Sequence, residues 1–220
     1  FVSPLQGRRA RHILAAMKRR TLLKAIGIPA ALGGAGVFAF MQRARAGNFY
    51  YDGPVSDHFD GTRFFLAGQT RDKTQAELWK WRTGGGKADW PAHYPSPMQD
   101  KPPQRVAGRA LRVTLIGHAS FLVQTGGLNI LIDPVYAERA SPVSFAGPRR
   151  VNPPGIAFDD LPPIDWVLVT HNHYDHMDVA FLRQLGGRFP AKILTPLGND
   201  AILAAAGVEA ETTARDWGQR

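Results

Sequence analysis

The chain has 220 residues and contains no cysteine, which argues against a disulfide scaffold and a thiolate metal site. The helical His-Glu-x-x-His motif is also absent, which argues against a thermolysin-like zinc site. The mildly apolar run at residues 25–40 is shorter than the roughly 20 residues that a membrane-spanning helix needs. A hydrophobic content of 44% is enough for a sizeable core.

Acidic residues are missing from residues 1–46, which hold nine basic residues. The remaining 18 basic residues equal the 18 acidic ones, so residues 47–220 have a formal charge of zero. The net charge of +9 therefore belongs to the N-terminal segment and not to a basic binding face. We expect no nucleic-acid partner.

The basic segment has the features of a targeting signal. The stretch MKRRTLLK at residues 17–24 resembles a twin-arginine export signal, and Ala-Arg-Ala at 44–46 fits a small-x-small cleavage site. We expect residues 17–46 to be a twin-arginine-like signal and the protein to be periplasmic or exported. An inner-membrane anchor and a cytoplasmic protein with a basic start stay open. Because Met17 fits an initiator, residues 1–16 are interpreted as an over-extended start.

Residues 47–104 are rich in proline, glycine and aromatic residues and have poor periodicity. This composition predicts an extended arm with a short helix near residues 74–80. We expect its aromatic side chains, Trp79 and Trp81 among them, to cover the edge of a core, with lipid contact as the alternative. His58 is interpreted as an arm-packing residue and not as a ligand.

Residues 105–220 alternate apolar strand patterns with helical ones, which is typical of a layered α/β domain. Gly126-Gly127 predicts a hairpin turn, and residues 135–163 predict a long loop. The expected strands are residues 111–116, 121–125, 128–132, 164–169, 192–194 and 208–212. The expected helices are residues 179–185, stopped by Gly186-Gly187, and residues 200–206.

The stretch HNHYDHMD at residues 171–178 directly follows a buried-strand pattern. In extended backbone His171 and His173 point the same way, so both rings can reach one ion. Asp175 and His176 can face a second ion beside the first. Two metal ions roughly 3.5–4 Å apart can share a hydroxide and clamp a reacting phosphoryl or acyl group.

This His-x-His-x-Asp-His pattern resembles the signature of the metallo-β-lactamase fold. Further motifs resemble the bacterial relatives of N-acyl-phosphatidylethanolamine-hydrolysing phospholipase D: Gly117–Ser120, Asp133–Val135, Arg139–Pro142, Gly147–Arg150 and Leu161–Asp165. The resemblance, over about residues 105–220, implies an α/β fold, the αββα sandwich. It also implies two zinc ions, the first held by His171 and His173 and the second by Asp175 and His176, with other divalent metals left open. Asp133 would support these ligands by hydrogen bonding.

No histidine follows His176, although the resembled family has further ligands downstream. We therefore expect residues 105–220 to be the N-terminal half of the sandwich, truncated at the C-terminus and inactive alone. A degenerate relative without metal stays open.

The expected function is zinc-dependent hydrolysis of a phosphodiester, with a phospholipid as the first choice of substrate. The nucleophile would be a metal-bridging hydroxide that the catalytic residue Asp175 orients. Candidate substrate-binding residues are His118, Arg149 and Arg150. The expected partner is a phospholipid or another small phosphodiester, with peripheral membrane contact. The alternatives are a zinc lactonase or other small-molecule hydrolase of the same fold, and a non-catalytic relative with an incomplete site.

Overall fold

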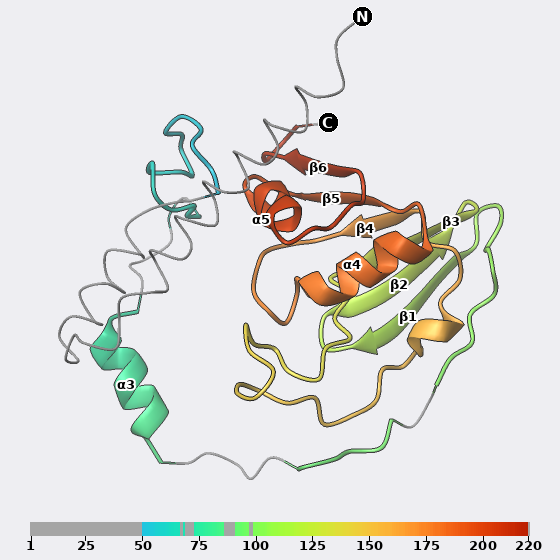
Figure 1. Cartoon of the computed structure of the whole chain (residues 1–220), viewed down its shortest axis with the longest axis horizontal. Helices are drawn as coiled ribbons and strands as arrows, with labels where there is room; N and C mark the ends of the chain where they lie inside the picture. The colour runs from blue at the N-terminus through green and yellow to red at the C-terminus, as the bar shows by residue number, and fades with distance from the viewer. Residues whose placement is uncertain (1–49, 67, 69–72, 86–90, 97–98, 220) are drawn as a thin grey trace, which may run out of the picture. The chain divides into compact units, whose positions relative to one another are not determined.

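The computed structural model describes residues 50–66, 68, 73–85, 91–96 and 99–219 (Figure 1). The predicted export signal at residues 17–46 lies outside them. The chain divides into two units, residues 1–69 and 70–220, which are considered separately. Among the described residues, no helix combines the length and the apolar character needed to cross a membrane.

The described part of the first unit is organised around a small aromatic cluster. Phe59 is buried, and its ring lies 4.6 Å from Phe64 and 5.0 Å from Tyr51 between ring centroids. His58 is also buried and its ring stacks on Phe64. This environment agrees with the packing role expected for His58.

The second unit is built on one six-stranded sheet whose spatial order follows the sequence order. Its strands are β1 (Leu111–Gly117), β2 (Ser120–Thr125), β3 (Leu128–Ile132), β4 (Trp166–Leu168), β5 (Lys192–Pro196) and β6 (Thr212–Arg215). The first three strands are antiparallel, and β3 to β6 are parallel. Gly126 and Gly127 join β2 to β3 with φ of 57° and 81°, the positive values that a tight hairpin turn requires.

Three α-helices accompany this sheet in the described residues: α3 (Gln75–Thr83), α4 (Val179–Arg188) and α5 (Asn199–Ala205). A short 3-10 helix, η1, spans Phe158–Asp160 in the long loop. Figure 1 shows α4 and α5 in front of the sheet, and both contribute buried residues to its core. The mixed, layered α/β class expected from the sequence is confirmed.

Two predicted boundaries are wrong. Helix α4 continues through Gly186-Gly187 and ends at Arg188, because the next residue, Phe189, precedes Pro190 and a residue before proline is driven out of the helical region. The strand predicted at residues 208–212 begins only at Thr212. Val208 instead closes the end of α5, since its amide donates to Leu203 O, with Gly207 before it at φ 75°.

One face of the sheet carries the core. Leu122, Leu131, Val167 and Ile193 lie in one hydrogen-bonded row across β2 to β5, and all four are buried. Side chains of α4 and α5 complete the cluster with Phe181, Leu182, Leu185 and Leu203. We call this the covered face.

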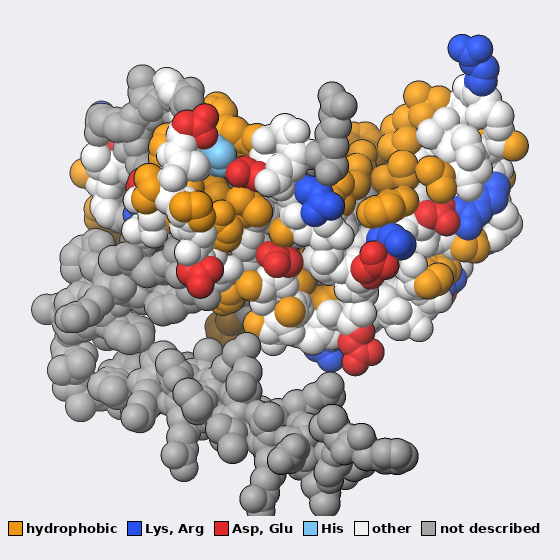
Figure 2. Space-filling model, turned by 90° about the horizontal axis from the view of Figure 1, so that it is seen from above, with side chains coloured by type: hydrophobic (Ala, Val, Ile, Leu, Met, Phe, Trp, Pro, Cys, Tyr) orange, Lys and Arg blue, Asp and Glu red, His pale blue; other side chains and the backbone are white. Residues whose placement is uncertain are grey.

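The opposite face is apolar but has no buried residue among its strand positions. Its rows are Leu115, Phe121, Ile132, Leu168 and Leu194, and Val113, Val123, Ile130 and Trp166. We call this the open face. Figure 2, in which the molecule is seen from above, shows hydrophobic side chains at the surface among charged ones.

The arm differs from the prediction at its helix. No residue of α3 is buried, and Trp79 and Trp81 are 66% and 76% exposed. The expectation that they cover a core edge is wrong. A later part of the arm does meet the sheet, where Gln124 and Asn129 donate side-chain hydrogen bonds to the carbonyls of residues 103 and 104.

Candidate metal centre

The strand directions gather polar residues at one edge of the sheet. Since β2 is antiparallel to both of its neighbours, β1, β3 and β4 run the same way. Their carboxyl ends lead into His118, Asp133 and the turn that begins at His171. The sequence motif alone covers only the last of these.

Two groups of possible metal donors occur here among the described residues. One contains His118, Asp175 and His176, and the other Asp133, His171 and His176. Within each group the ligand atoms lie within 4.8 Å of one another. His176 belongs to both groups. The expected pair of Asp175 and His176 lies in one group, whereas His171 is grouped with His176 and Asp133 and not with His173.

Asp133 orients two of the imidazoles. Its Oδ1 accepts the amide of Thr170 at 2.7 Å, and its Oδ2 accepts the hydroxyl of Thr170 at 2.6 Å. Oδ2 also lies 2.8 Å from His176 Nδ1, and the Thr170 hydroxyl lies 2.9 Å from His171 Nδ1. With both Nδ1 atoms as donors, each ring has Nε2 available to a metal. The three contacts of this buried carboxylate support the positioning role predicted for Asp133.

The electrostatics favour the ligating form of His171. Burial lowers the pKa of His171, and the neighbouring His176 and His173 lower it further. A lowered pKa keeps the imidazole neutral at pH 7, and a neutral imidazole is the form that binds a metal.

Asp175 is charged at neutral pH. Burial acts to raise its pKa, but its own backbone amide and the charges of His176 and His118 outweigh burial, so the pKa lies below its ordinary value. His118 Nε2 lies 2.9 Å from Asp175 Oδ2. His118, predicted as a substrate contact, is thus in direct contact with a predicted ligand.

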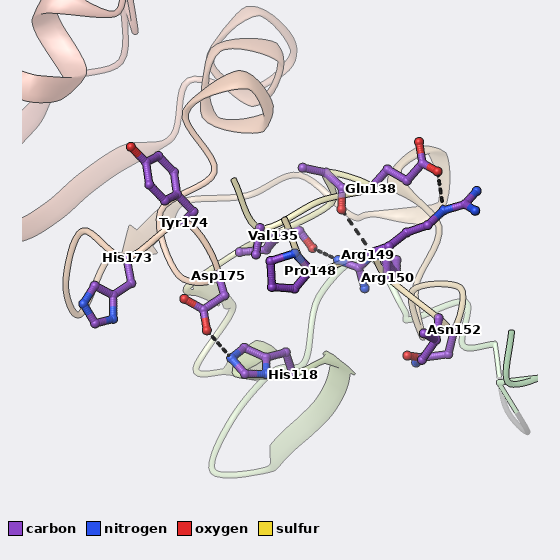
Figure 3. A pocket seen from close by; sticks show the side chains of 13 residues that line it. His118, Val135, Glu138, Pro148, Arg149, Arg150, Asn152, His173, Tyr174 and Asp175 are labelled. Carbon is purple, nitrogen blue, oxygen red and sulfur yellow. Dashed lines mark hydrogen bonds and ion pairs between the residues drawn. The ribbon is translucent and has the colours of Figure 1, made fainter. Parts of the chain in front are cut away.

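His173 stands apart from the tightest groups. Its ring centroid lies 4.6 Å from that of His171, yet it joins neither donor group among the described residues. In Figure 3, His173 and Tyr174 point away from the contact between Asp175 and His118. The short distance between the His171 and His173 rings agrees with the prediction that the two side chains lie close together. That both bind one ion stays a prediction.

The backbone is constrained at this edge. In the described ranges, the non-glycine residues with positive φ are His118, at 51°, and Asp133, at 41°. Such conformations persist where surrounding contacts hold them, and they concentrate at functional sites. Gly117, at φ 151°, allows close approach, since a Cβ there would lie 3.3 Å from Arg150 Nη1.

Asp178, the last residue of the histidine-rich stretch, was given no role from the sequence. It is buried and caps α4 by accepting the amide of Phe181 at 3.0 Å. Its other oxygen accepts the amides of Tyr136 and Ala137 at 3.0 and 2.7 Å. Asp178 therefore ties the histidine-rich turn to the loop after β3. Its position just before a helical pattern was the available signal.

A cavity of about 410 Å³ adjoins the donors (Figure 3). His118, His173 and Asp175 line one side, and Arg149 and Arg150 line another. A second cavity of about 540 Å³ shares lining residues with the first. Its apolar lining comes from Pro142, Val143, Met177, Val179 and Ala180, among other residues.

The two arginines differ. Arg150 is half-buried, donates to Val135 O at 2.6 Å, and has a pKa lowered by burial. Arg149 is exposed and pairs with Glu138 at 2.6 Å. The hydrogen bond from Arg150 thus helps to hold the loop, and the Arg150 side chain is also part of the cavity wall.

The donor set fits a divalent first-row metal. Imidazole nitrogens and carboxylate oxygens suit zinc and its neighbours, and His171 and His176 each have a hydrogen-bonded Nδ1 of the kind that metal-ligating histidines show. Asp175 and His118 lie in contact beside them, so that four side chains able to bind a metal gather at this edge.

Comparison with known proteins gives the following likenesses. The sequence model of the Beta-lactamase superfamily domain matches residues 128–220. An uncharacterized protein of Mycobacterium tuberculosis is 33% identical over 201 residues, which cover 90% of this chain and 52% of that protein. The N-acyl-phosphatidylethanolamine-hydrolyzing phospholipase D 1 of Caenorhabditis elegans is 39% identical over 114 residues, which cover 50% of this chain and 32% of that protein.

A UPF0173 metal-dependent hydrolase of Anaeromyxobacter sp. (strain K) is 35% identical over 115 residues, covering 52% of this chain and 37% of that protein. Among solved structures, an isothiocyanate hydrolase from Delia radicum gut bacteria is 25% identical with a TM-score of 0.39, covering 47% of this chain and 41% of that one. The chain spans about half the length of the mycobacterial relative and less of the others.

The family resemblance expected from the motifs is confirmed by these matches, and the model of the Beta-lactamase superfamily domain matches residues 128–220 of the chain.

Proposed function

We propose that this protein is a metal-dependent hydrolase that cleaves a phosphodiester bond in a phospholipid. The observation that carries the proposal is the cluster of His118, Asp133, His171, Asp175 and His176 beside a cavity of about 410 Å³. When bound, two divalent ions supply a hydroxide nucleophile at neutral pH and stabilise negative charge on the reacting group. We propose zinc, held by His171, His173, Asp175 and His176.

Residues of the chain orient the metal ligands and attract the substrate. Asp133 holds His171, through Thr170, and His176 in fixed orientations. Asp175 lines the cavity as a carboxylate and would orient the nucleophile. His118 fixes Asp175 through Nε2. Arg150 contributes a positive charge to the same wall, which favours an anionic phosphodiester.

A lipid substrate is supported by two further observations. The adjoining cavity of about 540 Å³ has apolar side chains on its lining, which suits the chains of an amphiphile. The relative from Caenorhabditis elegans bears the name of a phospholipase that hydrolyses N-acyl-phosphatidylethanolamine. Export through the twin-arginine-like segment remains part of this proposal.

The test is release of phosphatidic acid from N-acyl-phosphatidylethanolamine by the zinc-loaded gene product that contains this chain. We expect turnover that is lost with a chelator and in His173→Ala, and retained in His93→Ala, an exposed histidine outside both donor groups. Hydrolysis of a lactone with no release of phosphatidic acid would reject the lipid substrate and keep the hydrolase. No metal-dependent turnover of either would reject both.

A further inference from the structure

Among the described residues, the buried carboxylates are those of Asp133 and Asp178. A buried carboxylate is unfavourable unless hydrogen bonds replace its lost hydration. Asp133 contacts the imidazole of a metal donor, His176. The side chain of Asp178 instead accepts three backbone amides, one at the start of α4 and two in the loop after β3. The role of Asp178 therefore lies in the backbone segments that it joins.

The two side-chain oxygens of Asp178 hold different segments. Oδ1 accepts the amide of Phe181 and so caps α4. Serine and asparagine cap helices about as well as aspartate, so the cap needs only one oxygen. Oδ2 accepts the amides of Tyr136 and Ala137 at 3.0 and 2.7 Å. The second oxygen thus holds the loop independently of the helix cap.

The same loop segment is also held through its carbonyl groups. Arg150 Nη2 donates to Val135 O at 2.6 Å, and Arg150 Nε lies 3.5 Å from Ala137 O. Burial lowers the pKa of Arg150, and the electrostatic effects of Tyr136 and Asp178 oppose burial. A guanidinium and a carboxylate therefore hold one short segment, which contributes Val135 and Ala137 to the wall of the 410 Å³ cavity.

On its other side Asp178 continues from the turn that carries the metal donors. The amides of His176 and Met177 both donate to His173 O, at 3.0 and 2.8 Å. Met177 is buried in the core, and Asp178 O accepts the amide of Leu182 at 2.9 Å. A hydrogen-bonded turn that is anchored in the core thus joins the donor His176 to Asp178. A change in the position of one is transmitted to the other.

We propose that Asp178 is a positioning residue that couples metal binding at His176 to the order of the cavity wall at residues 135–150. A metal ion that fixes the turn also fixes Asp178 Oδ2, and through it the amides of the loop. Because coupling between two sites is reciprocal, an ordered loop in turn strengthens metal binding. The inference rests on the metal centre of the proposed function and on no particular substrate.

Limited trypsin digestion of the full chain, with and without zinc, measures the order of this loop. Arg139 and Arg149 are cleavage sites within it, and residues 142–149 are all exposed, so cleavage needs only a local opening. In the parent chain, saturating zinc should slow cleavage at both sites about fivefold or more. Asp178→Ser keeps an oxygen for the helix cap and removes the one that holds the loop. In this variant zinc should slow cleavage by less than about twofold.

Calorimetric zinc titration measures the reciprocal effect, under conditions in which urea unfolding shows the chains to be folded. Asp178→Ser should bind zinc about fivefold or more weakly than the parent, a change that a role in stability alone would not produce. The matched control is Asp60→Ser, because Asp60 also accepts two backbone amides but lies in the other unit. It should match the parent in both measurements.

The parent chain alone tests the coupling, whether or not the variant folds. A parent chain that binds zinc without slower cleavage at Arg139 and Arg149 overturns the proposal. So does Asp178→Ser with the zinc affinity of the parent. A parent chain that binds no zinc is a different result, because it rejects the metal centre of the proposed function together with the coupling.

Discussion

On the covered face of the sheet Leu122 and Leu131 are fully buried under α4, whereas on the open face Leu115 and Val113 are each 55% exposed. The two faces are built from alternate residues of the same strands, and across β1 to β3 the open face is the more apolar one. Composition therefore does not decide which face is covered; the helices after β4 and β5 do. The metal centre depends on the covered face, because Asp133 continues the side of β3 that carries Leu131.

The largest expected effect separates the two faces directly. Leu122→Ala removes a fully buried side chain and should lower the free energy of unfolding by about 2–5 kcal/mol. Leu115→Ala, the same chemical change on the open face, should alter it by about 0.5 kcal/mol or less. Urea denaturation measures both. Equal losses would mean that the open face is packed as tightly as the covered one.

The next effect compares the buried carboxylate of the site, Asp133, with the half-buried carboxylate of Asp175. Asp133→Asn cannot accept all three hydrogen bonds and should lower the free energy of unfolding by about 1–3 kcal/mol. It should also weaken zinc binding about 10–100-fold, since both oriented imidazoles lose their support.

Asp175→Asn is the matched change among the less buried donors. It should weaken zinc binding while leaving urea unfolding of the metal-free chain within about 0.5 kcal/mol. If Asp175→Asn destabilised the metal-free chain as much as Asp133→Asn, the distinction between support and ligand would be lost.

The smallest effect concerns the edge of the covered face at β1. Arg112 Nη2 and Thr114 Oγ1 both contact Asp100, at 2.8 and 3.1 Å from Oδ2. The hydrogen bond from Arg112 holds the pKa of Asp100 below its ordinary value, against the opposing effect of burial. A lowered folded-state pKa contributes stability that is present above the unfolded value near 3.8 and is lost as pH falls through the folded value.

The Asp100 contribution should be about 1 kcal/mol or less, because the pair is partly exposed. Asp100→Asn should therefore flatten the fall in unfolding free energy below about pH 4. Urea midpoints measured between pH 3 and pH 6 in both chains check this. Identical pH profiles would remove Asp100 as a source of the pH dependence.

The sequence predicted most strands and the histidine-rich turn because alternation and ligand density are local signals. The end of α4 was predicted wrongly, because Gly186-Gly187 indicated the end of a helix although α4 continues through both glycines. The sequence also missed the nearness of His118 to Asp175, which are 57 positions apart. That contact follows from strand direction, since β1 and β4 end at the same edge. The exposure of Trp79 and Trp81 could not be predicted, because aromatic composition does not reveal what lies opposite.

The central claim is that this edge of the sheet binds metal through donors shared by two groups. Calorimetric zinc titration of the metal-free chain tests it most directly, with His176→Ala and His93→Ala as the matched pair. Because His176 belongs to both donor groups, its removal should weaken zinc binding at least about 100-fold, while His93→Ala should bind like the parent chain. Equal zinc binding by His176→Ala and the parent chain would contradict the account.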